Sequence, residues 1–163
     1  MALNAYLTLA AETQGDIKGS VSQTGREDSI MVYGWNHQIV SPRDAASGLP
    51  TGKRQHKPLK LICEIDKATP LLYNVLVNNE NINTFILNMW RPSRTGQEEQ
   101  FYTVELFNAN LASIDVESLN NKIPENMRLP ELITYAFTYE KIIWTWQDGG
   151  IMAEDDWQAP NAG

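Results

Sequence analysis

Residues 132–146 read LITYAFTYEKIIWTW and contain the longest strand-like pattern in the 163-residue chain. Aromatic side chains occupy the odd positions Tyr135, Phe137 and Tyr139, and bulky side chains then occupy the even positions Ile142, Trp144 and Trp146. Alternation with a period of two is typical of a strand with one buried face, and one inserted residue shifts its phase. We therefore predict a single long strand over this range, with a β-bulge near Glu140 or Lys141.

The same alternation recurs along most of the chain. In residues 30–40, Trp35 lies on an apolar face, whereas Asn36 and Gln38 lie on the opposite face, which becomes polar toward its end. Because many strands occur without a βαβ rhythm, we predict a mainly β, closed or nearly closed antiparallel barrel. Further strands are expected at residues 3–10, 16–19, 59–66, 84–90, 102–106 and 111–116.

A single helix is predicted after Thr69-Pro70. Threonine accepts hydrogen bonds from first-turn amides, and proline at the first helical position loses no needed donor. An apolar stripe follows, and Asn78-Asn79 suits a helix end. The expected helix has about three turns.

Residues 41–58 form a long loop that is rich in proline and glycine and contains the basic cluster Lys53-Arg54-Gln55-His56-Lys57. A loop of this length inside a compact domain is usually functional or mobile. Three interpretations remain open: a solvated loop, a nucleic-acid patch, and a surface that meets acidic residues of another copy. The acidic residues 154–156, which follow the turn at 148–150, are the candidate for that last contact.

Composition limits the class of protein. The net charge of −7 disfavours nucleic acid and anionic membranes as partners. The lone Cys63 excludes an intrachain disulfide, and the short apolar stretch 5–11 precedes every basic residue, so no cleavable signal peptide is expected. No apolar run is long enough for membrane insertion. We expect one domain at residues 1–158 and a short tail at 159–163.

The sequence offers no catalytic constellation. His37 and His56 have no metal-ligand spacing, and both are expected to be solvated. A triad drawn from His37, Asp44 and a serine lacks the Gly-x-Ser-x-Gly elbow. We therefore expect no catalytic residue, no metal and no cofactor, and a small hydrolase is the weakest hypothesis.

The tryptophans support two interpretations. They could form a stacking platform for carbohydrate or bases, but Trp35, Trp90, Trp144 and Trp146 all lie in strand patterns. Barrel core or a subunit interface is the preferred assignment for these four residues. Tyr139 is assigned to the core with them.

Four blocks of sequence, in order, carry a resemblance that covers almost the whole chain. They are residues 16–20 (DIKGS), 51–58 with 64–73 (TGKRQHKP and EIDKATPLLY), 139–146 (YEKIIWTW) and 155–157 (DDW). Together they closely resemble the haemolysin-coregulated protein family, the tube subunit of bacterial type VI secretion systems.

The resemblance implies a two-sheet β-barrel flanked by one helix. It also implies a hexameric ring that stacks into a hollow tube inside a contractile sheath. Such proteins are not enzymes by default; they act as conduit, exported needle and holder of small effector proteins. The implied partners are further copies of the chain, sheath and spike proteins, and effectors. The implied locations are the bacterial cytoplasm, for the assembled tube, and the exterior after secretion.

Within this framework, residues 41–58 are the candidate for reaching a neighbouring ring or protomer. Arg43, Lys53, Arg54 and His56 would pair there with carboxylates. Asn36 and Gln38 are candidates for the lumen wall, or simply for a solvated sheet face. The alternative function is a β-sheet module that binds carbohydrate or peptide through exposed tryptophans.

Overall fold

The structure is a computed structural model that describes residues 3–157. The first elements are β1 (Ala5–Ala11), β2 (Gly15–Ile17), β3 (Ile30–Asn36), β4 (Ile39–Val40), β5 (Gln55–His56), β6 (Leu59–Glu64) and α1 (Thr69–Val77). They are followed by β7 (Ile82–Pro92), β8 (Glu98–Phe107), β9 (Asn110–Glu117), the 3₁₀ helix η1 (Pro124–Arg128), β10 (Leu132–Thr138), β11 (Lys141–Trp146) and β12 (Ile151–Asp156).

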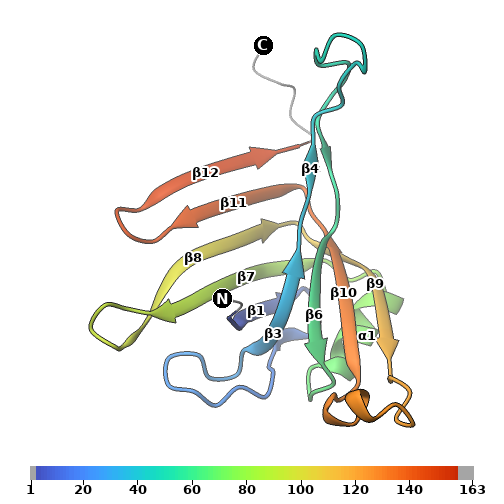
Figure 1. The fold of residues 1–163 in the computed structure, drawn as a ribbon, viewed down its shortest axis with the longest axis vertical. Coiled ribbons are helices and arrows are strands. Elements are labelled where there is room, and N and C mark those ends of the chain that lie inside the picture. The colour runs from blue at the N-terminus through green and yellow to red at the C-terminus, as the bar shows by residue number, and fades with distance from the viewer. Residues whose placement is uncertain (1–2, 158–163) are drawn as a thin grey trace.

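The strands form a bent antiparallel sheet that folds into two facing halves. Its strand order is β12-β11-β8-β7-β1-β3-β6-β10-β9, with β2 paired to β1 beside this path. The strands of the β7, β8, β11 and β12 half run across those of the β3, β6, β10 and β9 half (Figure 1). The predicted fold class, a mainly antiparallel β-barrel of two sheets with one short α-helix and a long extended loop, is confirmed.

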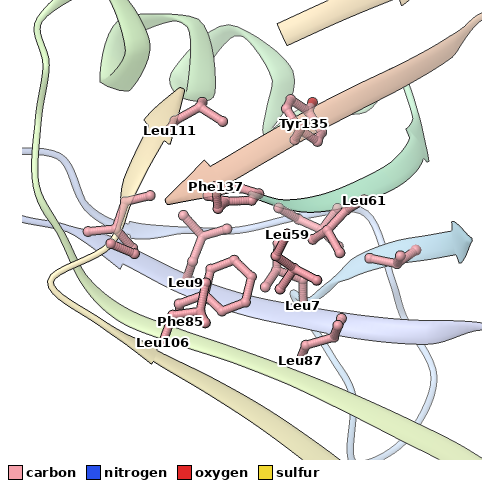
Figure 2. Packing of buried hydrophobic residues seen from close by; sticks show 14 of the residues in the cluster. Leu7, Leu9, Leu59, Leu61, Phe85, Leu87, Leu106, Leu111, Tyr135 and Phe137 are labelled. Carbon is pink, nitrogen blue, oxygen red and sulfur yellow. The ribbon is translucent and has the colours of Figure 1, made fainter. Parts of the chain in front are cut away.

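The core lies between the two halves. Leu7 and Leu9 of β1 lie near Phe85, Leu59 and Phe137 in Figure 2, and all five side chains are at most 2% exposed. The rings of Phe85 and Phe137 meet edge-on with centroids 4.8 Å apart. Aromatic and aliphatic groups on alternate strand positions therefore join the halves, as the period-two pattern predicts.

Helix α1 starts one residue earlier than the capping argument predicts. Ala68 occupies the N-cap position, and no side-chain cap bond is formed there. The Thr69 hydroxyl instead accepts a hydrogen bond from the Asp66 amide at 3.1 Å and lies 3.3 Å from the Tyr135 hydroxyl. Thr69 therefore ties the helix start to β10, while Pro70 lies in the first turn and Asn78 is the C-cap, as predicted.

The prediction of one bulged strand over 132–146 is wrong. β10 ends at Thr138 and pairs with β6 and β9, whereas β11 begins at Lys141 and pairs with β8 and β12. Tyr139 and Glu140 form the corner at which the chain crosses from one half of the sheet to the other. A corner of this kind shifts the alternation in the same way as a bulge, because it changes which side chains face the core.

Two further predictions about strands need correction. The strand predicted at 30–40 is interrupted after Asn36, and Ile39 and Val40 pair separately with β5. Residues 154–157 are expected to be an acidic tail, but residues 154–156 belong to the edge strand β12 (Ile151–Asp156). The expected domain end at residue 158 and the tail at 159–163 lie outside the described residues. Across residues 3–157, every helix is too short or too polar to cross a bilayer.

Candidate functional site

Residues 41–58, which we call the arm, project beyond the sheets on the β4–β5 ladder (Figure 1). The Thr51 amide donates to the Pro42 carbonyl at 3.0 Å, and the Asp44 amide donates to the Leu49 carbonyl at 2.8 Å. At the tip, the Ser47 amide and hydroxyl donate to the Asp44 carboxylate at 2.8 and 2.7 Å. The two bonds from Ser47 lower the pKa of Asp44. Together with the backbone bonds, they give the arm a regular hairpin-like structure along its length.

The surface of the arm is basic with an apolar tip. Arg43, Lys53 and Lys57 are all exposed, and Leu49 near the tip is 63% exposed. Such a projection offers cations and one aliphatic side chain to a partner, and little of it is used for packing within the chain.

The base of the arm is fixed to β12 by a charged pair. Arg54 donates from Nε to Asp155 Oδ2 at 2.5 Å and from Nη2 to Asp155 Oδ1 at 2.8 Å. The same Nη2 donates to the Asp156 carbonyl at 2.8 Å. Bidentate guanidinium–carboxylate pairs fix orientation as well as distance, so this pair sets the direction in which the arm leaves the sheet.

A chain of polar groups continues inward from this pair. His56 Nε2 lies 2.7 Å from Asp155 Oδ2, and His56 Nδ1 lies 2.7 Å from the Tyr139 hydroxyl. The Tyr139 hydroxyl also lies 2.7 Å from His37 Nε2. The His56 side chain is only 1% exposed, so both of its ring nitrogens must find partners inside the protein. We call the side chains of His37, Arg54, His56, Tyr139 and Asp155 the anchor.

Aromatic packing closes the anchor. The ring of Trp157 lies 5.7 Å from that of His56, and its Nε1 donates to the Tyr139 carbonyl. The Tyr139 ring meets His56 edge-on at 5.4 Å. The corner between β10 and β11, the arm and the end of β12 are thus joined at one place.

The surroundings set the charge states of the anchor. The hydrogen bonds from Arg54 lower the pKa of Asp155 below its ordinary value. Burial lowers the pKa of His37, and the neighbouring His56 lowers it further. Burial also raises the pKa of Tyr139, to which the charge of Asp155 contributes. Near neutral pH the anchor therefore favours a carboxylate, a neutral His37 and a neutral phenol.

The predicted contact residues of the arm fall into two groups. Arg43 and Lys53 are exposed, as a contact with another copy requires. Arg54 and His56 are instead engaged by Asp155 of their own chain. The basic cluster therefore meets the acidic 154–156 segment within one chain, and a contact of Arg54 and His56 with a neighbouring copy stays a prediction.

The expectation of solvated histidines is also wrong. His56 is buried, and His37 is half-buried with its Nε2 on Tyr139. A loop rich in polar residues gave no sign of burial, because burial here comes from β12 and the corner, which are distant in sequence. The sequence assigned Asp155 only to a contact with another copy, and it assigned no contact to Trp157. The Gly149-Gly150 turn between two runs was the available signal for the hairpin that places them.

The other candidate residues are distributed over the wall of the barrel. Asn36 and Gln38 are exposed, and the Gln38 carbonyl accepts a hydrogen bond from the Lys57 amide at 3.0 Å at the base of the arm. Trp144 and Trp146 are half-buried. Trp35 is 42% exposed, so it does not belong to the core of a single chain, and its assignment to a subunit interface stays a prediction.

Residues 3–157 contain no cluster of three or more His, Cys, Asp or Glu side chains that could hold a metal ion. Cys63 is fully buried, and burial raises the pKa of its thiol to about 12. The arm and its anchor are therefore the most distinctive feature for function.

Comparison with known proteins identifies the family. The family model described as "Type VI secretion system effector, Hcp" matches residues 6–146. The "Major exported protein" of Pseudomonas aeruginosa is 37% identical over 172 residues, with 100% of both chains covered.

Solved structures show the same fold. A crystal structure of an Hcp protein has a TM-score of 0.89 at 31% identity, covering 96% of this chain and 99% of that one. The Hcp1 protein from E. coli EAEC 042 has a TM-score of 0.84 at 30% identity, with the same coverage. This chain therefore belongs to the Hcp family of the type VI secretion system.

Proposed function

We propose that the chain is the structural subunit of a type VI secretion tube, forming hexameric rings that stack into a hollow conduit. Membership of the family supports this assignment. The observation that carries it is the arm, an ordered basic projection on an acidic chain whose base is fixed by a bidentate ion pair. Ring closure and stacking both need head-to-tail contacts between copies, and a rigid projection is suited to the second of these.

In this proposal the protein works through its shape and not by catalysis. The subunit assembles in the bacterial cytoplasm, is exported by the secretion system, and holds effector proteins inside the ring. Sheath and spike proteins contact the assembled tube. Asn36 and Gln38 are proposed to lie on the lumen wall, where amide side chains allow cargo to slide without strong adhesion.

The oligomeric state tests the proposal directly. Native mass spectrometry of the purified full-length chain is expected to show a closed hexamer, and electron microscopy along the axis is expected to show a ring with a central hole. A particle that stays monomeric at high concentration, with no ring in micrographs, would overturn the assignment.

One observation favours a second candidate function. A groove of about 360 Å³ lies between β3 and the β7–β8 hairpin, and its lining includes Tyr33, Trp35, Trp90, Phe101 and Tyr102. Aromatic faces of this kind stack on sugars and peptides. Iodide quenching of tryptophan fluorescence separates the two functions, because a binding platform stays accessible at all protein concentrations, whereas an interface becomes protected once rings form.

A further inference from the structure

We propose that His37, Tyr139, His56 and Asp155 make the anchor acid-sensitive: it fixes the base of the arm at neutral pH and loosens when a second proton enters the chain of hydrogen bonds. The proposal concerns the mobility of the arm within one subunit. It does not depend on the proposed function, because arm mobility can be measured whether or not rings form.

The two nitrogens of His56 and the hydroxyl of Tyr139 already have their hydrogen-bond partners inside the anchor. Both nitrogens of His56 are engaged, one by Tyr139 and one by Asp155, each at 2.7 Å. The Tyr139 hydroxyl lies between two imidazole nitrogens, with His37 Nε2 also at 2.7 Å. Because Tyr139 is 5% exposed, bulk water offers its hydroxyl little alternative.

The positions of the hydrogens follow from what each group can donate. A carboxylate only accepts, so His56 donates from Nε2 to Asp155. A neutral His56 then accepts at Nδ1, and the Tyr139 hydroxyl donates to it. The Tyr139 oxygen in turn accepts a hydrogen bond from His37 Nε2. All three bonds point toward Asp155, and both nitrogens of His56 and the Tyr139 hydroxyl are satisfied.

One additional proton can be accommodated by reversing part of the chain. If His56 carries hydrogens on both nitrogens, it donates to the Tyr139 oxygen, and the Tyr139 hydroxyl turns to a neutral His37. A second proton, on His37, makes both imidazoles donors toward the same oxygen. The Tyr139 hydrogen then has no acceptor among the anchor groups, and two cationic rings face each other across one hydroxyl. The doubly protonated chain therefore opens.

Neighbouring charges do not remove this conflict. Arg54 and Asp155 balance each other in the bidentate pair, and Lys141 pairs with Glu154 at 3.2 Å. Glu140, at the corner, accepts from Asn108 at 2.6 Å. The remaining charged groups at this place are Lys57, which is exposed, and Asp156, whose carbonyl accepts from Arg54.

The sign of the pH effect follows from His37. Its pKa in the folded protein lies below the ordinary value of about 6.5, so the closed anchor is fully stable above that pH and loses stability as the pH falls. The pKa of Asp155 is also lowered, so its carboxylate stays charged through this range and the Arg54 pair remains. The arm is therefore loosened in mild acid but still tethered.

A spin label on the arm measures this directly. Ala46→Cys places the label on an exposed residue near the tip, while the native Cys63 is fully buried and unreactive. Between about pH 7.5 and about pH 5, the open fraction is expected to rise by at most about a hundredfold per pH unit while both protons are taken up, and by at most about tenfold per pH unit once the first is bound. An arm equally immobile at both ends of this range would overturn the proposal.

Two variants identify the groups responsible. His37→Gln keeps a donor but cannot be protonated, so its arm is expected to remain immobile in mild acid. Tyr139→Phe removes the central hydroxyl, so its arm is expected to be mobile at neutral pH. Circular dichroism verifies that each variant is folded, and if Tyr139→Phe fails to fold, His37→Gln still decides. Loosening of His37→Gln with the same pH profile as the parent would refute the proposal, and this result would not depend on whether rings form.

Discussion

Gly19 lies where the chain passes too close to its own backbone for any side chain. A Cβ atom there would lie 2.4 Å from the Ser29 carbonyl oxygen and 2.8 Å from the Ile30 Cα. The Gly19 amide also donates to the Asp28 carbonyl at 2.9 Å, which holds the two segments together. This close approach explains why a glycine stands in the DIKGS block, and the sequence pattern alone did not show it.

We expect Gly19→Ala to lower the free energy of unfolding by about 1–3 kcal/mol, because the added methyl group meets backbone atoms that cannot move freely. Chemical denaturation measures the change. Gly52→Ala is the matched control, since an added Cβ there has no neighbour within 4 Å and its stability should stay within about 0.5 kcal/mol of the parent. Equal effects at the two sites would contradict this explanation.

Tyr139 supplies a second prediction at the residue scale. Tyr139→Phe leaves the buried His56 Nδ1 without its partner, which should cost about 1–3 kcal/mol of unfolding free energy at neutral pH. Tyr73→Phe removes a hydroxyl from a side chain that is 40% exposed on α1 and should cost little. Denaturant titration of both variants measures the difference. If Tyr139→Phe left the free energy of unfolding unchanged, the chain of hydrogen bonds would contribute nothing to stability.

At the scale of elements, the sequence predicts local structure better than it predicts pairing. The alternation covered the residues of β10 and β11 but predicted them as one strand, because a phase shift cannot distinguish a bulge from a corner and does not say which strands lie alongside. The anchor was beyond prediction for a similar reason. His56 and Asp155 are 99 positions apart, and only the completed sheet brings β12 beside the arm.

The link between β12 and the arm can be tested with Asp155→Asn. The change keeps the size of the side chain but removes the charge that Arg54 binds, so the base of the arm should open more often. We expect trypsin to cleave after Lys53 or Arg54 about tenfold faster at neutral pH. Glu154→Gln removes an equal charge from a side chain that is 59% exposed and should leave the cleavage rate unchanged. Similar rates in both variants would show that Asp155 does not hold the arm.

At the scale of the whole molecule, charge is distributed unevenly. The chain has a net charge of −7, yet the arm contains four basic residues and the single acidic residue Asp44. The remainder is therefore more acidic than the total suggests, and in the proposed stack this difference in charge would attract the arm of one copy to the body of another. Arg54 is committed to Asp155, so the cations left for such a contact are Arg43, Lys53 and Lys57.

We expect the double variant Arg43→Glu and Lys53→Glu to form rings but to stack poorly, because reversed charges on an exposed arm repel an acidic body while the barrel wall is untouched. Electron microscopy measures tube length, and native mass spectrometry measures the ring. Arg43→Lys with Lys53→Arg keeps the charge and should stack like the parent. Salt should shorten parent tubes as well, since attraction between exposed charges is screened beyond about 8 Å at physiological ionic strength. Tubes of parental length in the reversed variant would mean that stacking does not depend on the charge of the arm.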